Sequence, residues 1–183
     1  ETVNKSHFSD YGKKRKQLTE KDIYELFEGF KYVIPQGSVM YGLGNKKVIA
    51  SLSNCIVLPP TYDSYGGIFQ TDQQMAQLFK RRCGVGVDLS QLRPKKASVS
   101  NAAGTTTGAV SFMHRFSATT REVAQNGRRG ALMLTMDIAH PDIEEFITVK
   151  QDLKKVTGAN ISIRLSDEFM QAVINETDWQ LAF

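Results

Sequence analysis

The sequence is poor in cysteine and lacks any long apolar run. Its 183 residues include two cysteines, Cys55 and Cys83. Two thiols are too few for a disulfide framework, which makes a reducing cytoplasmic compartment the expected location. No apolar run approaches the roughly 20 residues of a membrane-spanning helix, and the polar first residues contain no signal core. We therefore expect a cytoplasmic protein without a membrane partner.

Histidine is also scarce, and its placement argues against a metal site. His7, His114 and His140 are scattered, and none of their spacings is typical of metal ligands. The sequence contains neither a Ser-His-Asp order nor a pair of closely spaced acidic residues that would indicate acid–base catalysis. We predict no metal ligands.

The excess of positive charge is mild and local. The formal net charge is +4, and basic residues cluster at 13–16, 80–82, 93–96 and 128–129. Aromatic residues do not alternate with these clusters as base-stacking platforms would, so nucleic acid is not an expected partner. A solvated surface is the commoner meaning of any single cluster. Anionic small ligands remain compatible with the charge.

Strand-like and helix-like patterns alternate from residue 48 onward. Alternation of this kind favours a mainly parallel sheet or barrel, whose ligands collect beyond the carboxyl ends of the strands. Ahead of it, 18–30 predicts a helix capped by Thr19 with Asp22 in the capping-box position, and 32–47 predicts a loop. The expected strands are 48–58, 84–92, 130–139, 159–166 and 179–183, and the expected helices are 67–83, 109–124, 140–151 and a helix from Asp167.

Several residues are candidates for chemistry. Cys55 lies in a predicted strand and is either a buried packing residue or a redox thiol that faces a pocket. Glycines at 84 and 86 allow a ligand close to the backbone, although a lone pair of glycines is weak evidence. Arg93, Arg128 and Arg129 present planar forks that match phosphate oxygens. These residues favour a phosphate-binding α/β domain.

The order of six stretches resembles the catalytic subunit of ribonucleotide reductase. The stretches are SLSNCIVL, GVGVDLSQLRP, TGAVSFMHRF, QNGRRGALM, HPDIEEFITVK and NISIRLSDEFM. The resemblance implies an α/β fold, in which residues 48–183 form the first part of a ten-stranded α/β barrel and the barrel is truncated. Residues 1–47 would be the end of an N-terminal helical region and a substrate-side loop.

The resemblance also implies roles for individual residues. Cys55 would be one of two thiols that reduce the ribose. Residues near the substrate would be Ser38, Ser53, Asn54, Cys83 and Gly84. Residues near a deoxynucleotide effector would be Asp63, Ser64, Arg93, Lys95, Gln125, Arg128 and Arg129. The last three belong to a loop that is about one residue shorter than is usual in the family, with Asn126 where a glycine is common.

The activity implied is reduction of ribonucleotides by thiyl-radical chemistry under deoxynucleotide control. The family's Asn-x-Cys-x-Glu segment and the thiol partner of Cys55 are absent, so we expect a fragment that is inactive alone. The implied cofactor is adenosylcobalamin, and the alternative is a separate di-metal radical subunit. A non-catalytic nucleotide-binding paralogue is the other functional hypothesis.

The expected partners are ribonucleoside di- or triphosphates, deoxynucleotide or ATP effectors, a thioredoxin-type reductant and a second copy of the chain. Helices near 66–82 and 108–124 are expected to pack side by side and form the dimer surface. Phe69, Met75, Phe112 and Phe116 are the candidate contact residues for that surface.

Overall fold

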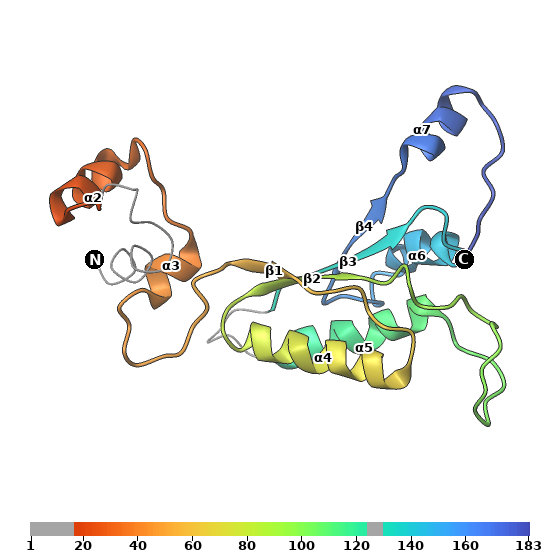
Figure 1. Ribbon diagram of the computed structural model, residues 1–183. Coiled ribbons are helices and arrows are strands. Elements are labelled where there is room, and N and C mark those ends of the chain that lie inside the picture. The colour runs from red at the N-terminus through yellow and green to blue at the C-terminus, as the bar shows by residue number, and fades with distance from the viewer. Residues whose placement is uncertain (1–16, 124–129) are drawn as a thin grey trace.

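The computed structural model describes residues 17–123 and 130–183. Their regular elements, in chain order, are α2 (Glu20–Phe27), η1 (Glu28–Phe30), α3 (Gly37–Gly42), β1 (Cys55–Val57), α4 (Tyr65–Phe79), β2 (Gly84–Asp88), α5 (Ala109–Glu122), β3 (Leu132–Asp137), α6 (Ile143–Thr148), η2 (Val149–Gln151), β4 (Asn160–Arg164) and α7 (Asp167–Ile174). Figure 1 shows the sheet between the N-terminal helices and α7.

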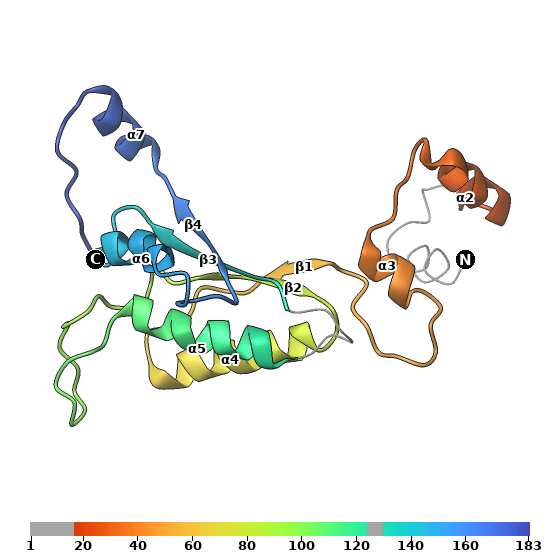
Figure 2. The ribbon, with the colours of Figure 1, turned by 180° about the vertical axis from the view of Figure 1, so that it is seen from behind.

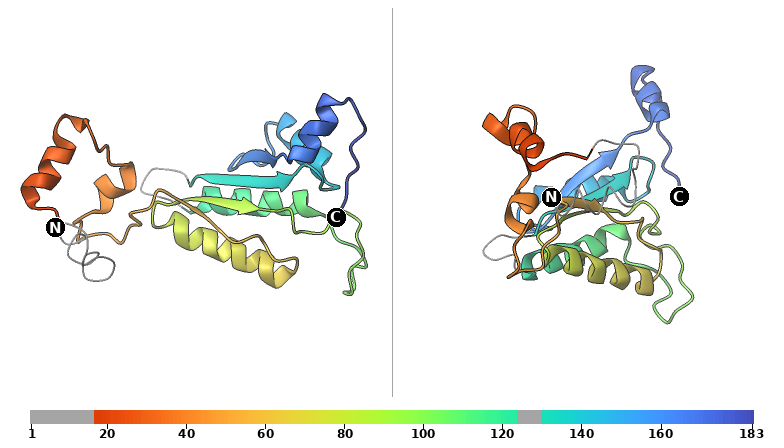
Figure 3. Two further views of the ribbon diagram at one scale, coloured as in Figure 1. Left: turned by 45° about the horizontal axis from the view of Figure 1, so that its top comes forward. Right: turned by 60° about the vertical axis from the view of Figure 1, so that its left-hand side comes forward.

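The four strands pair in parallel and in sequence order, β1-β2-β3-β4. Each successive strand therefore adds to the same edge of the growing sheet, next to the strand that precedes it in the chain. Helices α4 and α5 lie side by side along one face of the sheet (Figure 3). A doubly wound sheet would instead reverse its strand order and place helices on both faces. This one-directional growth is the arrangement of an α/β barrel and confirms the predicted fold class.

The covered face of the sheet forms the core. Strand side chains alternate between faces, and Val85, Val87, Leu132, Leu134 and Met136 are buried on one of them. These residues belong to one apolar cluster that also contains Phe79 of α4, Phe116 of α5 and Phe146 of α6. Met75 and Phe116 are fully buried in this cluster, so both are wrong as candidates for a dimer surface.

Two local predictions need correction. The segment 32–47 is not entirely loop, because α3 forms within it and buries Ser38. Residues 179–183 form no strand: Trp179 Nε1 donates to Ile138 O at 3.3 Å and Ala182 N to Ala139 O at 2.7 Å, which is docking and not a ladder. In contrast, the Thr19–Asp22 capping box at α2 is confirmed.

The turn after β3 holds the start of α5 in place. Asp142 is buried, and its carboxylate accepts hydrogen bonds from the backbone N–H groups of Lys95 and Ala109 at 3.0–3.1 Å. His140 Nδ1 accepts from Asp142 N, while His140 Nε2 lies 2.7 Å from Leu92 O and donates to it. Gly108 has a φ of +88°, and a Cβ there would lie 2.7 Å from the Asp142 carboxylate. The His-Pro-Asp sequence thus joins three loops at the carboxyl end of the sheet.

We expect Asp142→Ala to destabilise the fold by about 2–3 kcal/mol, because it leaves buried backbone donors without an acceptor. Asp142→Asn retains one carbonyl oxygen and should cost less. The matched control is Glu144→Ala, an exposed change nearby, which should stay within about 0.5 kcal/mol. Urea unfolding measures all three, and equal midpoints for Asp142→Ala and Glu144→Ala would contradict the capping role.

Candidate functional site

The face of the sheet opposite the core carries the candidate thiol. Cys55 is the first residue of β1, is exposed, and lies opposite Gly84 in the register with β2. An added Cβ on Gly84 would lie 3.3 Å from Cys55 Sγ and 3.6 Å from the Ala131 Cβ. Cys55, Gly84 and Ala131 therefore share one face, and they line a hollow of about 480 Å³ over that face. This volume is on the scale of a small-ligand site.

The second cysteine is buried. Cys83 immediately precedes β2, and its side chain is fully buried, whereas that of Cys55 is exposed. Its thiol donates to Gly84 O at 3.2 Å. Burial, followed by the nearby Cys55, raises the pKa of Cys83 above its usual value. A buried thiol of raised pKa is a poor nucleophile, so Cys83 is unsuited to exchange electrons with Cys55.

Three other predicted substrate residues, Ser38 of α3 and Ser53 and Asn54 before β1, lie on the two segments that meet ahead of Cys55. Ser38 N donates to Asn54 Oδ1 at 2.9 Å, and the Asn54 amide donates to Gln36. Ser53 N donates to the Ser51 hydroxyl at 3.0 Å. The hydrogen bond between Ser38 and Asn54 thus joins α3 to Ser53 and Asn54, the two residues that immediately precede Cys55. These residues lie at the amino ends of the strands, whereas the sequence pattern had placed the ligand site at the carboxyl ends.

A different hollow lies at the carboxyl ends of β1 and β2. Its volume is about 200 Å³, and Asp63, Ser64 and Arg93 are among the residues that line it. Arg93 Nε donates to Asp63 Oδ2 at 2.5 Å, and Arg93 Nη1 donates to Ser98 O at 3.0 Å. The Ser64 hydroxyl accepts from Gly67 N and caps α4. Tyr65, Asn101 and Phe112 also line the hollow, and sequence reasoning did not identify them as site residues.

Lys95 does not line this hollow. Its ammonium group contacts the Glu145 carboxylate of α6 at 3.1 Å. Gln125, Arg128 and Arg129 lie outside the described residues. The segment that contains them attaches at Val123, after α5, and at Gly130, before β3. The structure therefore brings together Asp63, Ser64 and Arg93 but does not place Lys95 with them.

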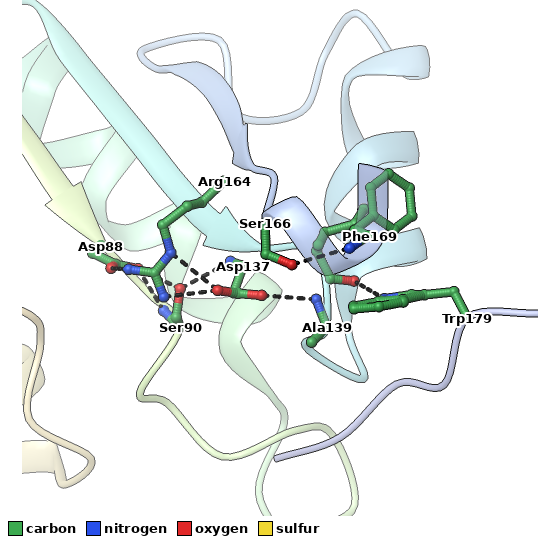
Figure 4. A network of polar contacts seen from close by, with 9 residues as sticks. Asp88, Ser90, Asp137, Ala139, Arg164, Ser166, Phe169 and Trp179 are labelled. Carbon is green, nitrogen blue, oxygen red and sulfur yellow. Dashed lines mark hydrogen bonds and ion pairs between the residues drawn. The ribbon is translucent and has the colours of Figure 1, made fainter. Parts of the chain in front are cut away.

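The carboxyl ends of β2, β3 and β4 carry a polar network that sequence reasoning missed (Figure 4). Arg164 contacts Asp137 at 2.8 Å and Asp88 at 3.3 Å, and the Ser90 hydroxyl accepts from Asp137 N at 2.9 Å. A hydrogen bond from Ala139 N, followed by Arg164, lowers the pKa of Asp137. The sequence did contain a signal for this network, because each of the three strands ends in a charged residue: Asp88, Asp137 or Arg164. Because the one guanidinium of Arg164 contacts both carboxylates, the network joins three strands.

No cluster of His, Cys, Asp or Glu within 17–123 and 130–183 could hold a metal ion. Over the same residues, no helix is long and apolar enough to cross a membrane. The described residues therefore offer a thiol on the bare face of a parallel sheet and a second hollow at the carboxyl ends of β1 and β2. Figure 2 shows α4 and α5 along the other face of that sheet.

A parallel sheet that grows in one direction, with its helices on one face, is the arrangement of a segment of an α/β barrel, and Cys55 lies on the face opposite the helices. Sequence comparison identifies which barrel. Residues 53–183 match the ribonucleotide reductase barrel domain, and the chain belongs to the ribonucleotide reductase family.

The relatives are long proteins of two named kinds. A vitamin B12-dependent ribonucleoside-diphosphate reductase of Thermoplasma acidophilum is 39% identical over 145 residues, which is 78% of this chain and 18% of that protein. A similar reductase of Mycobacterium tuberculosis is 38% identical over 67% of the chain and 18% of that protein. The large subunit from Dictyostelium discoideum is 32% identical over 71% of the chain and 16% of that protein. The chain thus spans less than a fifth of these relatives.

A solved structure supports the fold. The alpha subunit of the class Id ribonucleotide reductase of Actinobacillus ureae superimposes with a TM-score of 0.58 over 67% of this chain and 22% of that one. The sequence identity is 16%, so this likeness concerns the fold alone.

We expect the two thiols to differ strongly in reactivity. In the folded chain, iodoacetamide should modify Cys55 rapidly and Cys83 only after unfolding, because Cys83 is buried and its pKa is raised. Peptide mass spectrometry on native and urea-unfolded samples distinguishes the two sites. Cys55→Ser should remove the fast-reacting thiol, and rapid native modification of Cys83 would contradict the burial of its side chain.

Proposed function

We propose that this chain forms part of the catalytic subunit of a ribonucleotide reductase and that Cys55 is one of the thiols that reduce the substrate. The observation that carries the proposal is the exposed Cys55 on the bare face of the sheet, beside the backbone of Gly84. The reaction replaces the 2′-hydroxyl of a ribonucleoside di- or triphosphate with hydrogen. Two thiols become a disulfide and the hydroxyl leaves as water, while a thiyl radical activates the ribose.

Each residue around Cys55 has a role that its position supports. The absence of a side chain at Gly84 allows the substrate to approach both the sulfur and the backbone. Asn54, held by α3, fixes the chain that precedes Cys55. Cys83 contributes its backbone alone, because its thiol is buried. The second reducing thiol is therefore not Cys83, and a thioredoxin-type dithiol would restore the pair after each turnover.

The cofactor we propose is adenosylcobalamin, because the relatives that are 38–39% identical are named vitamin B12-dependent. When bound, it would supply the radical. The described residues do not themselves fit a corrin site: both ring nitrogens of His140 are engaged, and the hollow beside Cys55 is of small-ligand size. Contacts with the cofactor are accordingly not assigned to this chain.

We propose that the Asp63–Arg93 hollow binds the triphosphate of a deoxynucleotide or ATP effector. Arg93 is fixed by Asp63 and by Ser98 O, and it is followed by Pro94, which restricts its backbone to an extended form. A guanidinium held in this way is preorganised for phosphate. Lys95 contacts Glu145 in this structure, and its role in effector binding would require that ion pair to open.

The two proposed sites also favour a homodimer. The effector hollow lies at the start of α5, whereas the segment 124–129 attaches after its end, about 21 Å away for a helix of this length. Two copies whose α4–α5 pairs run antiparallel would place that segment of one copy near the hollow of the other. Tyr65 and Phe69 are exposed on α4 and suit such a contact. Gln125, Arg128 and Arg129 would then couple effector and substrate across copies.

The test of the proposed chemistry is Cys55→Ser in the complete catalytic chain. We expect turnover with a thioredoxin-type reductant to be lost while nucleotide binding is retained, because the hydroxyl cannot form the disulfide. Lys154→Ala, an exposed change before β4, should leave turnover unchanged. A Cys55→Ser protein that still completes many cycles with the dithiol would contradict the proposal. Retained binding without turnover in the wild-type complete chain would favour a non-catalytic nucleotide-binding paralogue.

Effector binding provides an independent test. Arg93→Ala should weaken all deoxynucleotide triphosphates similarly, by about tenfold to a hundredfold, because they share the phosphates. Arg129→Ala should instead change which ribonucleotide is reduced with each effector. Equilibrium binding and four-substrate competition measure the two effects. If Arg93→Ala left effector affinity unchanged, the proposal that this hollow binds the effector's phosphates would be contradicted.

A further inference from the structure

Asn160 is a polar residue on the bare face of the sheet that no role described above uses. It is the first residue of β4 and lies opposite Met133 of β3. Its side chain is exposed, and within 17–123 and 130–183 its carboxamide makes no hydrogen bond. A carboxamide offers both donors and an acceptor. Asn160 is therefore free to bind a ligand that lies over the sheet.

Asn160 borders two hollows. One is the hollow over the bare face, which Cys55 lines. The other, of about 230 Å³, lies at the amino edge of the sheet and is lined by Arg121 and Gly130. Three residues line both hollows, and among them Asn160 has the polar side chain, while Ala131 and Leu132 are apolar. Asn160 thus lies where the thiol-lined face meets the amino edge.

The distance between the two side chains suits a nucleoside. Cys55 and Asn160 lie on the outer strands, three inter-strand spacings apart across the sheet and two residues apart along it, which is about 16 Å on the diagonal. Allowing about 3 Å for a contact at each end leaves about 10 Å, which a ribose and its base fill. Gly84, Gly86 and Ala131 leave the floor open on the side of Cys55. Met133, directly opposite Asn160, is the large apolar side chain of the floor on the side of β4. A ribose at Cys55 would therefore extend its base toward β4.

We propose that Asn160 hydrogen-bonds to the base of the ribonucleotide and helps determine which base is accepted. This inference rests on the proposed function, because it takes the ribose to lie at Cys55. The Asn160 carboxamide can donate to a carbonyl such as O4 of uracil or accept from an amino group such as N4 of cytosine. Asn160 is a specificity-determining residue in this account and takes no part in the chemistry at the ribose.

The first test replaces the hydrogen-bond donor of the Asn160 carboxamide with an acceptor. In the complete catalytic chain, Asn160→Asp presents oxygens that accept from the amino group of cytosine and repel O4 of uracil. We expect kcat/KM for the uridine nucleotide to fall about threefold to tenfold relative to the cytidine nucleotide, measured in competition with one effector. Ser162→Ala, on the same strand and face but outside both hollows, should change this ratio by less than twofold.

Asn160→Ser shortens the side chain and provides a second test. It should raise KM for both pyrimidine nucleotides about threefold with kcat retained, and it should not reverse their order. Thermal unfolding verifies that each variant is folded, and Asn160→Ser decides the question if Asn160→Asp does not fold. If active Asn160→Asp kept the wild-type ratio of kcat/KM between the uridine and cytidine nucleotides, or if Asn160→Ser kept the wild-type KM, the role of Asn160 would be overturned. The proposed function would still stand. A wild-type complete chain that reduces no ribonucleotide would overturn the proposed function together with this role.

Discussion

The parallel pairing of β1 with β2 fixes where the thiol of Cys55 can act. Its register places Cys55 opposite Gly84 on the bare face, while Cys83, just before β2, is buried. A slip of one residue would turn Cys55 toward the covered face, because side chains alternate along a strand. The buried residues of β2 and β3 resist such a slip, since it would expose Val85, Leu132 and Leu134. Core packing therefore determines which thiol reaches a ligand.

The two proposed sites lie at opposite ends of the strands of this sheet. Cys55 and Gly84 begin their strands, whereas Asp63 and Arg93 follow the ends of β1 and β2. At the carboxyl edge, Arg164 joins Asp88 and Asp137, and Asp142 holds the loop before α5. These bonds hold the loops that form the hollow around Arg93. The face that carries Cys55 borders a hollow of about 480 Å³ instead, which suits a site that must admit a substrate.

The sequence predicted the order of elements well, because apolar periodicity and caps such as Thr19 act locally. It predicted strands that were too long, and it placed a strand at 179–183 where side-chain docking prevails. The family resemblance identified Cys55, Gly84, Asp63 and Arg93 as site candidates. Pattern alone could not predict that Lys95 contacts Glu145, or that Asn160 and Cys55 line one hollow, because those contacts depend on strand register and on residues far apart in the chain.

The most direct test of the account is a structure of the complete catalytic chain with a ribonucleotide and a deoxynucleotide triphosphate bound together. The account predicts the ribose of the substrate against Cys55 on the bare face, with its base toward β4. It predicts the triphosphate of the effector against Arg93 at the opposite end of the sheet. A substrate bound at the carboxyl edge beside Arg164, or both nucleotides bound at one end, would contradict it.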